Sequence, residues 1–394
     1  MNYLQSAQAL YEQMVRDRRH LHQHPEVGMD LPETCSYVMA RLTEMGYQPR
    51  RLGGGVTATV TGKPDGKVFL LRADMDALPM REESGLPFAS QRSCAHTCGH
   101  DMHTAMLLGA AQLLRDRAAE LNGTVKFMFQ PGEEVLSGAR SMIEAGILEN
   151  PHVDAAMGAH MIPMIPAGLG GYGTGVVSAS SDHLVIRVEG RGGHGAHPQS
   201  TVDPINIGVH IHLALQELLS READPAELVV LTFGKFQGGD AANIIPSSAV
   251  LEGTLRTFSE PLRTHLLERI DTICTCTAEA FRGRAQVTDL CSTCSLQIDG
   301  DTAAAVAQGW QREGLKMLQQ GEKMSGSEDF AEIAARVPST FFVVGEWVDR
   351  CGDSVKALFD AGHEIMNHSD SHPNMPKLSR ERMLEEINRC NDKI

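Results

Sequence analysis

The sequence has no apolar run of the roughly 20 residues that a membrane-spanning helix requires. Basic residues are also in deficit, because 35 lysines and arginines face 50 aspartates and glutamates, which gives a formal net charge of -15. This balance argues against nucleic acid or an anionic membrane as a partner. Residues 1–5 lack the basic start and apolar core of a signal peptide. Nine cysteines, an odd number without a compact framework, predict a reducing, cytoplasmic setting.

The length and composition indicate a globular protein of more than one domain. A chain of 394 residues is long for one hydrophobic core and suits two domains. Its 42% hydrophobic and 22% charged residues are typical of soluble globular proteins. The sequence shows no internal repeat or low-complexity segment that would suggest a solenoid or a disordered linker.

Residues 94–103 read Cys-Ala-His-Thr-Cys-Gly-His-Asp-Met-His and precede a helix-like apolar pattern over 104–119. Thiolate and imidazole are ligands that borderline divalent metals prefer. Cys98 and His100 could face one ion because Gly99 between them permits a tight backbone. By itself, this stretch is also compatible with a loop that holds no metal.

Three strand-like segments lead to further groups of the kind that bind metals. These segments span residues 67–72, 124–130 and 155–158, and another strand is expected over 55–61. Asp76 follows the first, Glu133 and Glu134 follow the second, and His160 follows the third. Open α/β sheets place their sites at such strand ends, although an aspartate there can also be a simple turn or cap residue. Adjacent glutamate carboxylates repel each other. In a metal-dependent hydrolase, one of them could bind the metal while its neighbour acts on the attacking water.

The middle of the chain has a different pattern. Strand-like segments at 183–189, 229–235 and 249–258 are interspersed with helix-like segments at 204–219 and 261–280, which predicts an inserted α+β unit with an antiparallel sheet. The insert contains His194, whose flanking glycines fit either a close backbone approach or a mobile loop.

Taken in order, the motifs resemble those of the aminoacylase, hippurate hydrolase and indole-acetyl-amino-acid hydrolase group of dinuclear metallopeptidases. The resemblance covers residues 15 to about 345 and rests on Arg19-His-Leu-His-Gln-His-Pro-Glu26, Arg72-Ala-Asp-Met-Asp-Ala-Leu-Pro79, Cys98-Gly-His-Asp101, Gln130-Pro-Gly-Glu-Glu134, Gly158-Ala-His160, Gly192-Gly-His-Gly-Ala-His-Pro198 and Gly326-Ser-Glu-Asp-Phe330. It implies an α/β fold, with a catalytic domain of mixed sheet and flanking helices (1–181 and 296–394) and an inserted α+β lid and dimerisation domain (182–295).

The resemblance also implies the chemistry and the residues that perform it. The expected reaction is hydrolysis of the amide bond of N-acyl amino acids, or of related small amides or dipeptides, in a homodimer or higher oligomer. Two divalent ions per subunit are expected, zinc or manganese, with cobalt and nickel as further options. The implied metal ligands are Cys98, His100, Glu134 and His160. The other implied site residues are Glu133 as general base, Asp76 as a residue that orients a ligand, His194 as a donor to the partner subunit's oxyanion, and Asn243 and Arg256 as substrate contacts.

The end of the chain departs from this family. From about residue 340 the sequence resembles a fragment of a polysaccharide deacetylase of the chitooligosaccharide type, in which His368 and His372 would match a metal-binding pair. The Thr-Phe-Asp-Asp motif of that family is missing upstream, which disfavours a carbohydrate N-deacetylase. Either residues 341–344 form the amidohydrolase's own late strand and His372 supplies its last metal ligand, or a rearranged C-terminus leaves the second ion under-coordinated. The continuous deacetylase-like pattern through 378–382 favours the second alternative, an impaired or non-catalytic homologue.

Overall fold

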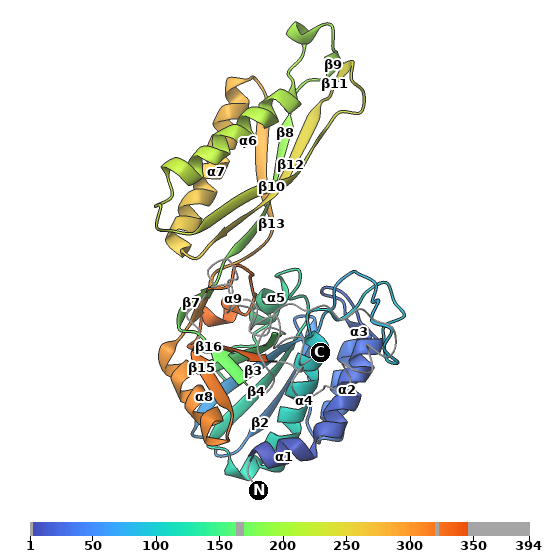
Figure 1. Cartoon of the computed structure of the whole chain (residues 1–394), viewed down its shortest axis with the longest axis vertical. Helices are drawn as coiled ribbons and strands as arrows, with labels where there is room; N and C mark the ends of the chain where they lie inside the picture. The colour runs from blue at the N-terminus through green and yellow to red at the C-terminus, as the bar shows by residue number, and fades with distance from the viewer. Residues whose placement is uncertain (1–2, 163–168, 320–322, 346–394) are drawn as a thin grey trace, which may run out of the picture.

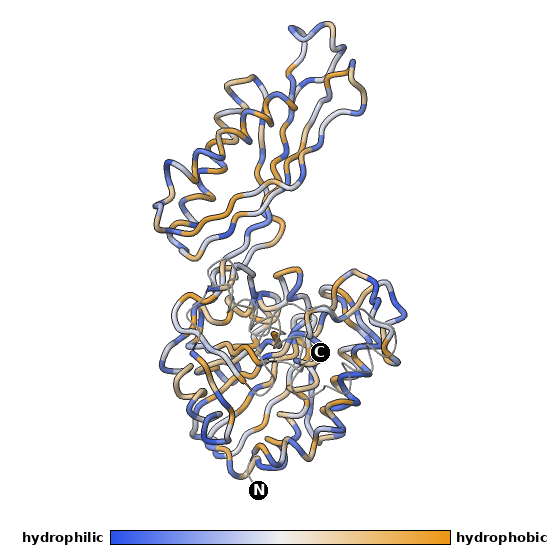
Figure 2. Tube along the Cα trace, in the orientation of Figure 1, coloured by the Kyte–Doolittle hydropathy of each residue, from blue (hydrophilic) through white to orange (hydrophobic). Residues whose placement is uncertain are grey.

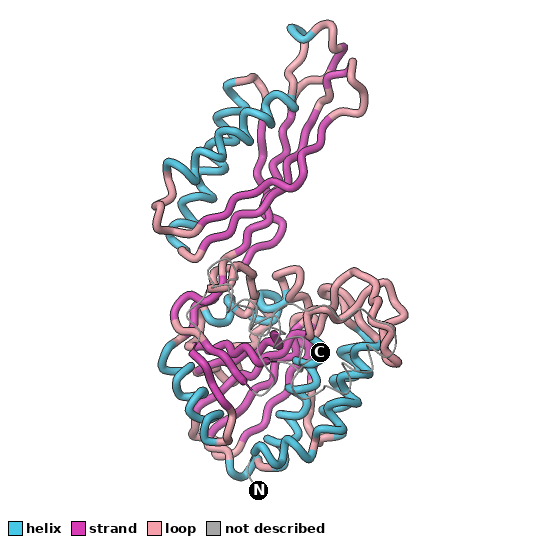
Figure 3. Tube along the Cα trace, viewed as in Figure 1, coloured by secondary structure: helices cyan, strands magenta, loops and turns pink. Residues whose placement is uncertain are grey.

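The computed structural model describes residues 3–162, 169–319 and 323–345, whose helices and strands form two parts (Figure 1). The larger part contains a mixed eight-stranded sheet, here called the large sheet, in the order β1-β2-β4-β3-β5-β16-β6-β15. Its strands are β1 (Arg50–Leu52), β2 (Gly55–Thr61), β3 (Lys67–Asp74), β4 (Gly123–Gln130), β5 (Ala155–Ile162), β6 (Leu169–Tyr172), β15 (Lys316–Gln319) and β16 (Ser339–Gly345). Helices flank this sheet (Figure 3), so the predicted α/β class is confirmed.

Both faces of the large sheet are buried, which explains why its central strands are nearly continuous apolar runs. Along β4, Phe127 and Phe129 point into a core shared with α3 (Pro32–Glu44) and α4 (His100–Asp116). Met128, between them, points to the opposite face and packs with residues of α5 (Gly138–Glu144) and α9 (Ala331–Ala334). Apolar residues accordingly concentrate in the sheet, while the outer helices carry polar ones (Figure 2).

The remaining helices complete the two layers around the large sheet. They are α1 (Tyr3–Ala9), α2 (Tyr11–Gln23), α8 (Gly300–Arg312) and the short η1 (Ala118–Glu120). Helix α2 packs on α4, and α8 packs on β15 and β16, where Trp310 lies against Phe342 with their ring centroids 4.7 Å apart.

Two differences from the expected boundaries affect the candidate site residues. The helix expected from residue 104 begins at His100, because Gly99 takes a left-handed conformation (φ 92°) that ends the preceding loop one turn earlier. The strand expected to end at Gly158 continues to Ile162, because β16 pairs with it in parallel from Ala156 to Ile162. His160 therefore lies within β5 rather than beyond it.

The smaller part is the predicted α+β insert, and its sheet is antiparallel throughout, as expected. The strand order is β10-β12-β8-β13. Its elements are β8 (Ser181–Glu189), β10 (Val229–Gly238), β12 (Ser248–Thr257), β13 (Arg284–Thr293), α6 (Pro204–Arg221) and α7 (Glu260–Ala280). Alternate residues of β12, including Leu251 and Leu255, point toward α6 and α7 and are buried. Among the described residues, the two helices therefore cover one face of this sheet. A two-stranded arm, β9 (Gly193–His194) with β11 (Ile244–Ile245), projects from the end far from the large sheet (Figure 1).

Strands β7 (Gly175–Ser178) and β14 (Leu296–Ile298) pair with each other in the segments that connect the two parts. The short η2 (Pro198–Ser200) lies within the insert, after β9. No helix among the described residues combines the length and apolar character needed to cross a membrane.

The deacetylase-like end of the chain begins inside the large sheet. Strand β16 lies between β5 and β6, and Phe341 and Phe342 are buried there. Residues 341–344 thus form a late strand of the larger part, as the first of the two alternatives for the tail requires. His368 and His372 lie outside the described residues.

Candidate metal centre

The candidate site lies where three parallel strands end beside the start of α4. Strands β4, β3 and β5 are parallel neighbours in the large sheet. Their carboxyl ends meet at one edge, so Asp76 after β3, Glu133 and Glu134 after β4, and His160 near the end of β5 converge there. The left-handed turn at Gly99 and the start of α4 bring Cys98 and His100 to the same edge.

The ligand-type atoms of this cluster stand at separations that an ion could bridge. Cys98 Sγ lies 3.4 Å from His160 Nε2, and two such atoms on one tetrahedral zinc are about 3.3–3.6 Å apart. His100 Nε2 lies 3.9 Å from Glu134 Oε1 and 4.0 Å from Glu133 Oε2, no more than twice a metal–ligand bond of about 2.0–2.2 Å. These residues form two overlapping groups able to hold an ion, Cys98 with His100 and His160, and His100 with both glutamates.

Buried polar atoms at the cluster have no hydrogen-bond partner within the described part of the chain. They are both ring nitrogens of His100 and the Oε1 atom of Glu134. Buried polar atoms normally have a partner, and a bound ion can supply one. The residues present therefore fit a bound divalent metal.

The electrostatic environment also favours a cation. Burial by itself opposes a charge on His100, but the Asp74 carboxylate and a contact with Asp76 raise the pKa of its ring well above the ordinary value. Burial, together with neighbouring carboxylates, raises the pKa of Glu133, and burial raises that of Glu134. Carboxyl groups that resist ionisation and a histidine that attracts a proton both indicate a shortage of positive charge at this edge.

Asp76 holds the two glutamates in place through their backbone. Its Oδ1 accepts the N–H of Glu133 (3.1 Å), and its Oδ2 accepts the N–H of Glu134 (3.2 Å). The same carboxylate lies 3.4 Å from His100 Nδ1. Asp76 is thus in contact with the backbone or ring of three residues of the cluster, which is the position of a residue that orients ligands.

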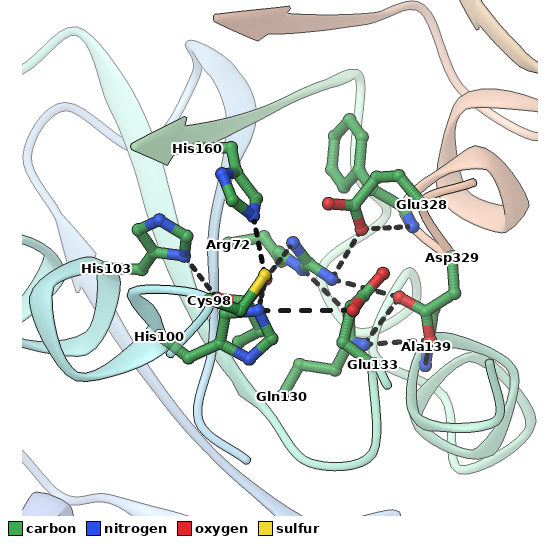
Figure 4. A network of polar contacts seen from close by, with 12 residues as sticks. Arg72, Cys98, His100, His103, Gln130, Glu133, Ala139, His160, Glu328 and Asp329 are labelled. Carbon is green, nitrogen blue, oxygen red and sulfur yellow. Dashed lines mark hydrogen bonds and ion pairs between the residues drawn. The ribbon is translucent and has the colours of Figure 1, made fainter. Parts of the chain in front are cut away.

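A buried arginine underlies the cluster (Figure 4). The guanidinium of Arg72 is fully buried and donates to Asp74 (2.8 Å), Glu328 (2.8 Å) and Asp329 (2.9 Å). Although burial opposes its charge, these carboxylates raise the pKa of Arg72 above its ordinary value. Glu133, Glu328 and Asp329 lie close enough to hold an ion together, but the guanidinium already supplies positive charge there.

Gln130, the last residue of β4, joins this network. It accepts from Arg72 Nε (2.9 Å) and donates to Asp329 (2.7 Å). Asp329 also accepts the N–H of Ala139 (2.9 Å), which is in the first turn of α5.

Sequence reasoning missed several residues of this centre. They are Arg72, Asp74, His103, Glu328 and Asp329, all buried. The sequence did offer a reason to consider these residues, because each lies in or beside a motif that carries the family resemblance. Spacing along the chain, however, does not show that residues 72 and 328 are in contact.

Three further predicted site residues are not among the groups of described residues that could hold an ion. His194 and Asn243 are exposed on the arm, where the Gly195 N–H donates to the Asn243 carbonyl (2.8 Å). Arg256, near the end of β12, donates to Ser327 Oγ (3.0 Å) and the Ser325 carbonyl (3.3 Å). His372 is outside the described residues.

Cysteine, histidine and glutamate side chains gathered at the strand ends of an α/β sheet are typical of metallohydrolases. The sequence matches peptidase family M20/M25/M40 over residues 70–356. It is 37% identical over 339 residues to N-acetyl-L-cysteine deacetylase of Bacillus subtilis (strain 168), a match that covers 85% of this chain and 81% of the relative. The chain therefore belongs to the M20/M25/M40 peptidase family.

Other relatives and solved structures are consistent with this family assignment. N-acyl-L-amino acid amidohydrolase of Geobacillus stearothermophilus is 40% identical over 250 residues, covering 62% of this chain and 67% of the relative. A Bacillus subtilis structure described as a dinuclear metal binding peptidase from the M20 family superposes with a TM-score of 0.72 at 34% identity, covering 86% of this chain and 89% of the other. Residues 334–394 match a second family, polysaccharide deacetylase, so both resemblances inferred from the sequence are confirmed.

Removing the charge of Arg72 should destabilise the larger part strongly. In Arg72→Met, Asp74, Glu328 and Asp329 lose their common partner while staying buried, and we expect the free energy of unfolding to fall by about 3–5 kcal/mol. Urea unfolding of metal-free protein, followed by tryptophan fluorescence, measures this loss, since Trp310 packs inside the larger part.

The matched control is Arg140→Met, because Arg140 is 43% exposed and pairs with one carboxylate, Glu332. This variant should lose no more than about 1 kcal/mol. Equal losses in the two variants would contradict a special role for the buried network.

Proposed function

We propose that this chain is a metal-dependent amidohydrolase that cleaves N-acyl amino acids or related small amides and dipeptides. The observation that carries the proposal is the convergence of Cys98, His100, Glu134 and His160 around Glu133 at one sheet edge. The names of the relatives support the substrate class, since they include an N-acetyl-L-cysteine deacetylase and an N-acyl-L-amino acid amidohydrolase.

In this proposal Cys98, His100, Glu134 and His160 hold two divalent ions. Bound ions of this kind polarise an amide carbonyl and lower the pKa of a water molecule toward neutrality. Thiolate and imidazole suit zinc, whereas the carboxylate suits manganese, and cobalt or nickel are further candidates. The burial of Glu134 and His100 keeps the ions away from bulk water and strengthens their effect.

Glu133 acts as the general base and then as the general acid. It takes a proton from the attacking water and returns it to the leaving amine. Burial and the carboxylates of Glu328 and Asp329 raise the pKa of Glu133 above its ordinary value, which favours its acceptance of a proton. Asp76 fixes the backbone of Glu133, so this carboxylate has a defined position before substrate arrives.

The catalytic domain comprises residues 1–181 and 296–394, and residues 182–295 form a lid that also dimerises. The exposed apolar side chains Val209 (43%) and Leu213 (60%) on α6, with the open edge of β10, provide a surface for a second copy. We place the homodimer, or a higher oligomer, in the cytoplasm, in keeping with the free cysteines of the described residues.

His194 and Asn243 serve the partner subunit's site, because the arm points away from the metal-ligand cluster of its own chain (Figure 1). The Ala196 N–H donates to His194 Nδ1 (3.1 Å), so neutral His194 carries its proton on Nε2 and can donate it to a developing oxyanion. Arg256 would grip the substrate carboxylate, exchanging its contact with Ser327 for a forked pair of hydrogen bonds.

Replacing Glu133 should abolish turnover while leaving the metal bound. We expect Glu133→Gln to lower kcat for N-acetyl-L-cysteine by about 10²–10⁴-fold, because the amide cannot accept the proton of the water. Zinc content, measured by elemental analysis, should match the wild type. Glu144→Gln, an exposed glutamate of α5, is the control and should behave as wild type. Full turnover in Glu133→Gln would exclude it as the base.

A mixing experiment tests the contribution of the partner subunit. His194→Ala and Glu133→Gln should each be nearly inactive as pure dimers. After exchange of subunits, about a quarter of wild-type activity should return, since half of the dimers are mixed and one of their two sites is complete. Absence of recovery in demonstrably mixed dimers would place His194 in its own subunit's site or outside catalysis.

The C-terminal match to polysaccharide deacetylases favours an alternative, an impaired or non-catalytic homologue with an incomplete metal site. The number of metal ions bound per chain distinguishes the active amidohydrolase from the impaired homologue. If the tail completes the site, wild-type protein binds two ions per chain, and His372→Ala reduces both metal content and turnover, whereas the nearby control His363→Ala does not. One ion or none in the wild type, without turnover in added zinc or manganese, would support the impaired homologue.

A further inference from the structure

His103 lies beside the candidate ligands His100 and His160. It is buried in α4, one turn after His100, and its ring centroid is 5.4 Å from that of His100 and 4.5 Å from that of His160. By distance alone, Asp74, His100 and His103 could hold an ion together. The hydrogen bonds of the His103 ring show whether this residue can bind a metal ion.

Both ring nitrogens of His103 are occupied by the protein. The backbone N–H of Met161 donates to His103 Nε2 (2.9 Å), and His103 Nδ1 lies 2.6 Å from Asp74 Oδ1. A backbone N–H can only donate, so Nε2 must accept and its lone pair is used. The proton of the neutral ring is therefore on Nδ1, where the Asp74 carboxylate accepts it. No lone pair remains for a metal.

The backbone of Met161 also sets His160 in the Nδ1–H tautomer. His160 Nδ1 lies 2.7 Å from the Met161 carbonyl oxygen, which can only accept, so Nδ1 carries the proton. His160 Nε2 is then left with a free lone pair, 3.4 Å from Cys98 Sγ. Met161 thus contacts one histidine through its N–H and the other through its carbonyl.

The sheet explains why the Met161 N–H is available. Strand β5 pairs with β3 only as far as Gly158, and beyond it no strand among the described residues pairs with the β3 side of β5. His103, projecting from α4, takes the place of that strand at Met161. Asp74 at the end of β3 holds the other side of the ring, so His103 links the ends of β3 and β5 to α4.

We propose that His103 is a positioning residue rather than a metal ligand: by anchoring Met161, it keeps His160 in the metal-binding tautomer with its Nε2 atom directed at Cys98. The inference rests on the proposed metal centre and adds a role for a residue outside the ligand set. Contacts of this kind around a ligand typically change metal affinity by about 10–100-fold when they are removed.

Two near-isosteric variants separate the two hydrogen bonds. In His103→Asn, the amide nitrogen replaces Nδ1 and keeps the Asp74 contact but leaves the Met161 N–H without its acceptor. In His103→Gln, the amide oxygen replaces Nε2 and keeps the Met161 contact but loses the donor to Asp74. The exposed surface residue His152, changed to Asn, is the matched control, and His160→Asn is the ligand-loss reference.

The first measurement is calorimetric titration of chelator-stripped protein with zinc. We expect His103→Asn to lower the affinity of one of two zinc ions by about 10–100-fold, with both ions still binding at saturation. His103→Gln should stay within a few-fold of the wild type. Complete loss of one ion in both His103 variants, as in His160→Asn, would make His103 a ligand and overturn the proposal. Unchanged zinc affinity in His103→Asn, with only lower stability, would also overturn it.

The second measurement needs no metal. Long-range ¹H–¹⁵N spectra of metal-free protein report the tautomer of each histidine, and the variants assign the signals. We expect Nδ1–H for both His103 and His160 in the wild type, kept at His160 in His103→Gln and lost in His103→Asn. An Nε2–H signal for His103 would contradict the proposal. If wild-type protein bound no zinc while the spectra came out as expected, the proposed function would fail and the positioning contact would stand.

Discussion

A single buried guanidinium, that of Arg72, holds together the edge of the large sheet that carries the candidate metal centre. It is surrounded by Asp74, Glu328 and Asp329, and through Gln130 it also joins the end of β4. Charges removed from water cost several kcal/mol each unless they are paired, so this arrangement persists only when every member is present. The chain segments that end β3, end β4 and begin α9 are thereby fixed relative to one another, although more than 250 residues separate Arg72 from Asp329 along the chain.

The candidate metal centre lies on this fixed edge, and the charges of the edge residues determine its electrostatic character. Arg72 balances part of the negative charge, and the remaining carboxylates surround His100, whose ring nitrogens have no hydrogen-bond partner within the described residues. Asp76 and His103 then set the direction of the ligand-type groups, one through the backbone of the glutamates and the other through that of Met161. The groups able to bind metal are thus aimed by hydrogen bonds to neighbours that are not ligands themselves.

Strand β16 shows how a sequence of another family can be accommodated in this fold. The two family matches overlap over residues 334–356, and this strand lies within the overlap. A buried strand between β5 and β6 requires a short apolar run, and Thr340-Phe-Phe-Val-Val344 provides one. The large sheet can accommodate this segment because a buried strand requires apolar volume and β propensity, not a particular sequence. A metal site depends on a particular side chain at a particular place, so a departure from the family pattern beyond this strand would bear on activity rather than on the large sheet.

The sequence by itself determined the two-part organisation suggested by its patterns, the α/β class, the antiparallel insert and the family, because hydrophobic periodicity and motif order are local properties of the chain. It also pointed to Cys98, His100, Glu133, Glu134 and His160, since these residue types follow strands whose ends share one edge. Only the tertiary structure decided that Arg72 meets Glu328 and Asp329, that β16 extends β5 past His160, and that His103 is occupied at both nitrogens. Those facts depend on contacts between distant segments, and on which hydrogen-bonding partners remain after the strands have paired, neither of which is encoded in spacing.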